Sequence, residues 1–318
     1  MDHPIQPIEE GLAGPPPAKS VGLGTRLFDQ PYLLLLLAIL FWSGNFILGR
    51  AVRLEVPPVG LAFWRWLGGS LIIFGFAWPH LKRDWPVILR HWKIILLLSI
   101  LGVATFNTLV YTGLQYTTAI NALLMQSTMP VMIVAMTYLF FSEVITPRQA
   151  VGVGLSLIGV LAIIAQGDPQ VLLSLSLNSG DLLIVLAVVF YAAYSALLRR
   201  RPVLHPLSFI LITFILGVLA LLPFYLWENL AGRVMAFNSV TFLAVGYVAI
   251  FPSVLAYLCY NRGVELLGAN RAGLFFHLMP VFGSLMAMLF LGERFRLYHV
   301  VGIGLILTGI VLATRPPR

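Results

Sequence analysis

The chain has 318 residues, of which 59% are hydrophobic and 10% charged, and its mean hydropathy is +0.94. These values exclude an ordinary soluble globular domain, and continuous apolar runs that can cross about 30 Å of hydrocarbon as helices exclude a transmembrane β-barrel. The net charge of +8 comes from basic residues scattered between the apolar runs, so it indicates membrane topology and not a nucleic-acid partner.

Residues 1–30 have a different composition from the rest of the chain. They combine the run Pro15-Pro16-Pro17 and several glycines with acidic residues, Lys19 and Arg26. A signal peptide needs a basic start followed by an uninterrupted apolar stretch, which this segment lacks. We therefore expect a disordered cytoplasmic tail.

The remaining chain predicts an all-α integral membrane protein with ten transmembrane helices. An even number of spans places both termini on one side, and the excess of lysine and arginine on that side predicts an N-in, C-in orientation. The predicted spans are 32–52, 58–79, 93–114, 119–141, 148–166, 180–199, 206–227, 239–261, 270–291 and 298–314.

The sequence repeats itself at an offset of about 150 residues. "MPVMIVAMTYLFFSEVITPRQAVGVGLSLIGV" aligns with "MPVFGSLMAMLFLGERFRLYHVVGIGLILTGI", and "LFWSGN" aligns with "VFYAAY", which pairs Trp42 with Tyr191. We predict two five-helix repeats, 31–166 and 180–314, that together form one transport domain. Because five is odd, the second repeat enters the bilayer from the opposite side, an arrangement common in alternating-access carriers.

The ten spans, the early "FWSGNFILGR" and the paired "PVMIVAMTYLFFSE" and "PVFGSLMAMLFLGER" resemble the EamA family of the drug/metabolite transporter superfamily. The similarity extends over about residues 32–314 and is greatest to the YddG-type exporters. The resemblance implies a multi-pass protein of the bacterial inner membrane that exports aromatic and other neutral amino acids. A carrier of another metabolite or of a cationic drug remains the alternative.

Polar and aromatic residues gather on single faces of six predicted spans. A hydrogen bond between packed helices explains any one such polar residue, but helix packing does not require so many aromatic rings. We therefore predict a central substrate cavity bounded by spans 1, 3, 4, 6, 8 and 9, with spans 5 and 10 at the periphery. Its predicted lining is Trp42, Asn45, Asn107, Tyr111, Thr128, Tyr191, Ser195, Tyr257 and His277.

Pro130 and Pro280 occupy matching mid-span positions, where each would remove a backbone hydrogen bond and kink the helix. A hinge for opposite gates and a static bend for packing both remain open. Glu143 and Glu293 end spans 4 and 9, and we predict an interfacial structural role for them.

Two further charged or titratable side chains lie within predicted spans. Arg65, in "FWRW", is expected to snorkel to the headgroups, with Trp64 and Trp66 in the interfacial belt. His277 is the only group near mid-membrane with a titration range close to neutral pH, so it is a candidate for proton coupling or a neutral hydrogen-bonding partner in the cavity.

Other functional classes lack their motifs in this sequence. No histidine and carboxylate cluster has metal-ligand spacing, and no GxSxG or phosphate-binding glycine loop occurs. A channel would require a repeated filter or rings of charge. We expect no enzyme activity and no cofactor; the expected partners are a small solute and the bilayer, for which a monomer suffices. A membrane protein without transport activity remains a further alternative.

Overall fold

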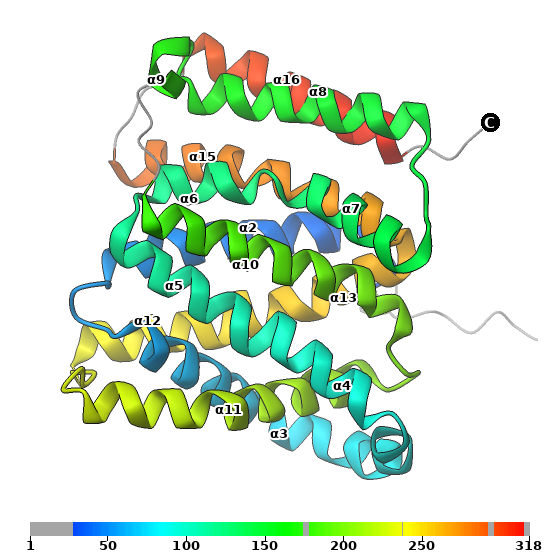
Figure 1. Ribbon diagram of the computed structural model, residues 1–318, viewed down its shortest axis with the longest axis vertical. Helices are drawn as coiled ribbons and strands as arrows, with labels where there is room; N and C mark the ends of the chain where they lie inside the picture. Colours follow the sequence, from blue (N-terminus) through cyan, green and yellow to red (C-terminus); the bar gives the residue numbers. More distant parts are fainter. Residues whose placement is uncertain (1–27, 174–177, 237, 292–295, 315–318) are drawn as a thin grey trace, which may run out of the picture.

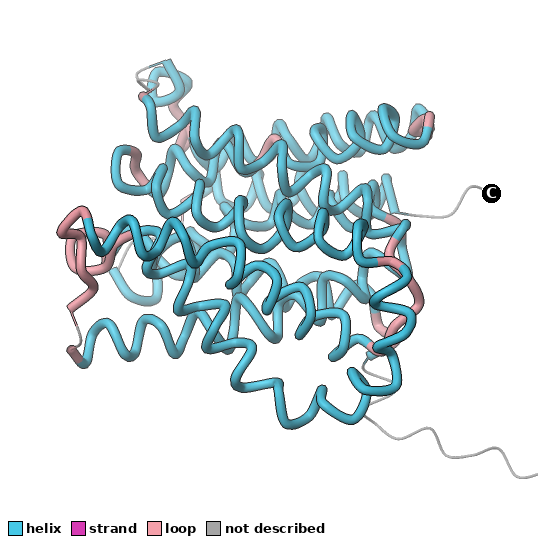
Figure 2. The backbone as a smooth tube through the Cα atoms, turned by 60° about the horizontal axis from the view of Figure 1, so that its bottom comes forward, coloured by secondary structure: helices cyan, strands magenta, loops and turns pink. Residues whose placement is uncertain are grey.

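The computed structural model describes residues 28–173, 178–236, 238–291 and 296–314. Within these ranges the chain forms helices and connecting loops and no strand (Figure 2). The predicted disordered tail lies almost entirely outside the described residues, as does Glu293. The all-helical prediction is confirmed for the part of the chain that the structure describes.

The helices are labelled in chain order. They are α2 (Pro31–Ala51), α3 (Pro58–Arg90), α4 (Trp92–Leu98), η1 (Ser99–Thr105), α5 (Phe106–Tyr116), α6 (Ala119–Gln126), α7 (Met129–Phe141), α8 (Pro147–Ile164), α9 (Pro169–Leu173), α10 (Ser179–Leu197), η2 (Leu198–Arg200), α11 (Pro206–Leu230), α12 (Ser239–Ala249), η3 (Ile250–Leu255), α13 (Ala256–Leu267), α14 (Ala269–Gly273), η4 (Leu274–Leu278), α15 (Met279–Leu291) and α16 (Leu297–Thr314).

Nine helical segments in the described ranges are long and apolar enough to cross a membrane. They include the segments Trp92–Tyr116, Asn121–Phe141 and Ser239–Leu267, each of which comprises two or three consecutive helices. The span predicted at 270–291 is divided into α14, η4 and α15 and is not among the nine. Figure 1 shows the long helices stacked side by side, with α8 and α16 at one end of the stack and α3 and α11 at the other.

The α8 and α16 helices pack against each other along their length through glycines. A Cβ on Gly152 would lie 2.6 Å from the Gly309 carbonyl oxygen, and one on Gly159 would lie 2.6 Å from the Gly302 carbonyl oxygen. Small residues at a helix contact let two backbones approach closely, which is how helices associate where hydrocarbon removes the hydrophobic driving force. This pair corresponds to the predicted peripheral spans 5 and 10.

Two segments depart from α-helical geometry at equivalent places. The π-helical segments η1 and η3 interrupt the third and eighth predicted spans and begin 151 residues apart, at Ser99 and Ile250. A π-turn shifts the backbone hydrogen-bond register and is frequent at functional sites. Both interruptions lie beside the centre of the bundle, where their backbone carbonyls accept side-chain hydrogen bonds.

Both mid-span prolines lie at interruptions of their predicted spans. The fourth predicted span is already interrupted at Ser127 and Thr128, and Pro130 is in the first turn of α7. Pro280 is likewise the second residue of α15, directly after η4. Since a first-turn residue donates no intrahelical hydrogen bond, proline is tolerated at these positions.

Candidate functional site

Four aromatic rings surround Trp42 of α2 at the centre of the bundle. Trp42 stacks on Phe276 with ring centroids 5.6 Å apart and meets Tyr191, Tyr257 and Tyr260 at 5.6, 5.8 and 5.1 Å. All five side chains are buried. Trp42, Tyr191 and Tyr257 were predicted as cavity residues, and the structure brings them together from α2, α10 and α13, with Tyr260 and Phe276 as further members.

A polar cluster lies next to these rings. The Tyr111 hydroxyl donates to Asn45 Oδ1 at 2.6 Å, which joins α5 to α2. The guanidinium of Arg65 donates through Nη1 to the same Asn45 oxygen at 3.0 Å and to the Tyr111 hydroxyl at 2.8 Å. The predicted lining residues Asn45 and Tyr111 thus face the protein interior, where they bind the guanidinium of Arg65. Arg65 itself was expected at the membrane surface.

The expectation that Arg65 snorkels to the headgroups is wrong. Its side chain is fully buried, with its Nε donating to Ser253 Oγ at 2.6 Å and its Nη2 to the Pro252 carbonyl oxygen at 2.8 Å. Trp66 is also fully buried, under the guanidinium at 4.6 Å and 5.2 Å from the Tyr257 ring, so it is no belt residue.

The position of Arg65 within its predicted span already indicated that its side chain is buried. It lies seven residues inside the predicted span 58–79, which corresponds to about 10 Å of helix. An arginine at that depth faces the protein interior more often than lipid. The second predicted span therefore contributes to the centre of the protein, contrary to the expected boundary of spans 1, 3, 4, 6, 8 and 9.

Backbone carbonyls of the two π-helical segments accept side-chain hydrogen bonds in this centre. The Pro252 carbonyl of η3 accepts from Trp42 Nε1 and from Arg65 Nη2, both at 2.8 Å. The Gly102 carbonyl of η1, 150 residues earlier, accepts from the Tyr257 hydroxyl. The altered helix register thus turns main-chain oxygens into part of the central lining.

A second amide and phenol pair lies on another side of the rings. The Tyr194 hydroxyl donates to Asn261 Oδ1 at 2.9 Å, joining α10 to α13. The hydroxyls of Ser195 and Tyr260 are 2.9 Å apart on the same two helices. Ser195 was predicted as a lining residue, and the structure places it here with Asn261, which the prediction omitted.

Several buried polar atoms in the centre make no hydrogen bond of standard geometry within the described residues, and two of them belong to side chains that were predicted to line the cavity. They are Nδ2 of Asn107 and the hydroxyl of Tyr191. An unsatisfied buried donor is costly, and such atoms are explained by an absent ligand or water, or by a role in function. Both side chains lie within reach of the Tyr257 hydroxyl, at the edge of the ring cluster.

Thr128 and His277 are the predicted lining residues that the structure does not bring to the Trp42 rings. The Thr128 hydroxyl donates to the Met125 carbonyl of its own segment at 2.7 Å. His277 is fully buried, with Nε2 3.0 Å from the Ser127 carbonyl oxygen, so it links η4 to the interruption between α6 and α7.

A cavity of about 520 Å³ opens beside the second amide and phenol pair. Its lining includes Ser195 and Asn261 together with charged residues at the ends of α7, α10 and α13, among them Glu143, Arg199 and Glu265. We call this cavity the vestibule. It is large enough for a solute of amino-acid size. Two of its lining residues, Ser195 and Asn261, hydrogen-bond to Tyr260 and Tyr194 beside the central rings.

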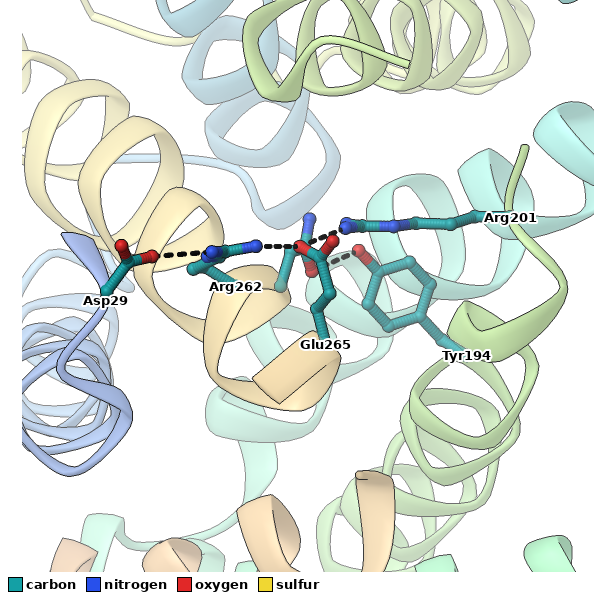
Figure 3. A network of polar contacts seen from close by, with 6 residues as sticks. Asp29, Tyr194, Arg201, Arg262 and Glu265 are labelled. Carbon is teal, nitrogen blue, oxygen red and sulfur yellow. Dashed lines mark hydrogen bonds and ion pairs between the residues drawn. The ribbon is translucent and has the colours of Figure 1, made fainter. Parts of the chain in front are cut away.

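A line of ion pairs includes Arg201 and Glu265, which line the vestibule (Figure 3). Asp29 pairs with Arg262 at 2.6 Å, Arg262 with Glu265 at 3.0 Å, and Glu265 with Arg201 at 2.7 Å. In Figure 3 these side chains run in a line with Tyr194 beneath it. The line connects the segment before α2 to α13 and to the loop before α11.

Glu143 makes similar interhelical contacts at the end of α7. It pairs with Arg199 at 2.9 Å, and its other oxygen accepts from Asn270 at 3.1 Å. Glu143 and Arg199 are both exposed, so this ion pair contributes little stability by itself. The contacts fit the interfacial structural role expected for Glu143.

The apolar helices surround a buried aromatic and polar centre, and a vestibule lies beside it. This architecture is that of a multi-pass membrane transporter. The profile of the EamA-like transporter family matches residues 30–165 and again residues 178–315. The chain therefore belongs to the EamA-like transporter family.

The chain is also similar to proteins that are named as transporters, and the similarity covers nearly their whole length. The uncharacterized transporter YyaM of Bacillus subtilis is 28% identical over 287 residues, which cover 89% of this chain and 93% of YyaM. An uncharacterized transporter of Archaeoglobus fulgidus is 30% identical over 288 residues, covering 90% and 98%. A crystal structure with 19% identity superposes with a TM-score of 0.69 over 89% of this chain and 96% of the other, and so shares the fold.

Proposed function

We propose that the protein exports small organic solutes, foremost aromatic and neutral amino acids, across the bacterial inner membrane by alternating access. The observation that carries this proposal is the Trp42 ring cluster, which has an amide and phenol pair on each of two sides and is linked to the vestibule through Ser195 and Asn261. Aromatic rings stack on an aromatic solute, and buried amides and hydroxyls fix its orientation. A carrier of another metabolite or of a cationic drug is the second candidate.

The amide and phenol pairs support a duplicated gate. Asn45 and Tyr194 are 149 residues apart, and Tyr111 and Asn261 are 150 apart, so equivalent positions of two repeats hold the same pair with the roles exchanged. Each pair joins two helices of one half of the chain. In the proposed cycle, one pair separates to admit the solute while the other stays closed.

The double match of the family profile supports the assignment of residues 31–166 and 180–314 as repeats. We propose ten spans, with 270–291 as the ninth despite its division by η4. The N-in, C-in orientation then places the vestibule and its ion pairs at the cytoplasmic face. Arg199, Arg201 and Arg262 at that face agree with the positive-inside rule.

Purified protein in liposomes tests the transport proposal. We would load the vesicles with labelled phenylalanine, tryptophan, threonine or a nucleotide sugar and measure efflux. Saturable flux of the amino acids is expected, because a carrier has a limited number of sites. Flux of the nucleotide sugar alone would refute the substrate assignment, and flux of none of these solutes, from vesicles with folded protein, would refute the proposed function.

The orientation can be tested with single cysteines at the two ends of α11. Val203 and Leu230 are strongly exposed, and the helix between them is long enough to span the membrane. In a Cys259→Ser background, which removes the only cysteine of the chain, we expect an impermeant maleimide to label Leu230→Cys in intact cells and Val203→Cys only after lysis. The reverse pattern would contradict the N-in, C-in proposal.

A further inference from the structure

The buried guanidinium of Arg65 has neutral partners throughout the described part of the protein. Its four hydrogen bonds go to Asn45, Tyr111, Ser253 and the Pro252 carbonyl, and none of the ion pairs found among the described residues includes it. Arginine remains charged in proteins. Neutral oxygens solvate this charge but leave it uncompensated, so an anion that reaches it is strongly favoured.

The acidic side chains that the structure describes do not supply a counter-ion. The two that are buried, Asp181 and Glu228, have partners of their own. Asp181 accepts from the Thr117 hydroxyl and the Asn178 backbone N–H, and Glu228 accepts from the backbone N–H groups of Val59 and Gly60. The centre of the described bundle therefore holds a fixed cation and no fixed anion.

The donors around Arg65 converge on two oxygen positions. Nη2 of Arg65 and Nε1 of Trp42 both donate to the Pro252 carbonyl oxygen, each at 2.8 Å. Nη1 of Arg65 and the Tyr111 hydroxyl both donate to Asn45 Oδ1, at 3.0 and 2.6 Å. A carboxylate carries two oxygens that match the paired donors of a guanidinium, and this charge-assisted arrangement is stronger than neutral hydrogen bonds.

We propose that Arg65 binds the carboxylate of the transported solute, in place of the oxygens of Asn45 and Pro252, while the apolar part of the solute lies on the Trp42 rings. The solute class is then aromatic and apolar monocarboxylates, with or without an amino group. Amines that lack a carboxylate are excluded, because they bring a second positive charge to a buried cation. This inference rests on the proposed transport function and argues against cationic drugs as solutes.

Three indole compounds separate the carboxylate from the rest of the solute. We would titrate the full-length protein in detergent with indole-3-propionate, indole-3-propionamide and tryptamine. Wild type should bind the carboxylate at least about tenfold more tightly than the amide, since a hydrogen bond to a charged group exceeds a neutral one by this order. Tryptamine should bind more weakly than either. Equal affinity for the carboxylate and the amide would overturn the inference.

Two variants connect the preference to Arg65. Arg65→Gln should bind the carboxylate and the amide equally. Asn45→Asp keeps the size of the side chain and supplies an internal counter-ion, so it should also abolish the preference even if Arg65→Gln does not fold. The matched control Asn229→Asp, at the far end of α11, should leave the preference unchanged. A folded Asn45→Asp protein that retains the tenfold preference would contradict the proposed anchor.

The binding and flux experiments fail in different ways. If wild type carries amino acids but binds the carboxylate and the amide equally, the transport proposal stands and the Arg65 anchor falls. If wild type shows the carboxylate preference but no solute moves in liposomes, the anchor stands as a binding site and the transport proposal falls.

Discussion

Replacing Gly159 with leucine is expected to lower the free energy of unfolding by about 3 kcal/mol or more, the upper part of the range for overpacked interiors. The Gly302 carbonyl oxygen and the Ile306 backbone nitrogen would lie 2.6 and 2.9 Å from the new Cβ. Backbone atoms of a packed helix cannot rotate away as a side chain can, so α8 and α16 must separate. The loss should appear as a lower melting temperature in detergent and a smaller monodisperse fraction.

Gly154 offers a matched control on the same helix. A Cβ at Gly154 meets no atom within 4 Å, and Gly304 of α16 is equally open. Gly154→Leu and Gly304→Leu should therefore behave like wild type in both measurements, because the added side chain points away from the other helices and meets no protein atom. A similar loss for Gly154→Leu and Gly159→Leu would show that leucine propensity or expression, not the contact between helices, is responsible.

The repeated glycines show which features of the fold the sequence could predict. Hydropathy and the offset of 150 residues identified the apolar spans, and the alignment of Gly152 and Gly159 with Gly302 and Gly309 marked equivalent positions. The sequence did not show that these two glycine sets contact each other, because pairing depends on how the halves dock. The π-helical geometry of η1 and η3 was equally unpredictable, since tertiary contacts decide where a helix shifts its register.

Only part of the candidate site could be predicted, because the rest also depends on tertiary packing. Helical spacing identified Trp42, Asn45, Tyr111, Tyr191 and Tyr257, because a polar or aromatic stripe on an apolar span must face protein. Helical spacing cannot place a side chain that could point either into the protein or toward the membrane surface. Arg65 combines a long side chain with neighbouring tryptophans, which is equally typical of an interfacial anchor, and only the packing of α3 against α2, α5 and η3 decides between the two.

His277 and Thr128 illustrate the opposite error. Both fall on polar faces of their predicted spans, but both spans are interrupted, at Ser127 and Thr128 and over η4. An interruption changes the angle between successive residues from the 100° assumed for an α-helix, so the faces on the two sides of it do not align. His277 then meets a freed backbone carbonyl instead of the aromatic rings.

Replacing Trp42 with alanine is expected to reduce the transport rate at low solute concentration by at least about tenfold. Each aromatic pair contributes about 0.5–1.5 kcal/mol beyond area burial, and Trp42 contacts four rings of the centre. The change also removes the indole N–H that binds Pro252. Initial efflux of labelled tryptophan from liposomes, divided by the amount of folded protein, measures the effect.

Two further variants separate the solute site from protein stability. Trp42→Phe keeps a ring and most of the packed volume but loses the N–H donor, so its rate should lie between wild type and Trp42→Ala while its melting temperature stays close to wild type. Trp227→Ala removes a tryptophan that is 67% exposed on α11 and should transport normally. If Trp42→Ala also transports normally when folded, the ring cluster is structural packing and the solute binds elsewhere. The vestibule, which Ser195 and Asn261 help to line, would then be the remaining candidate site.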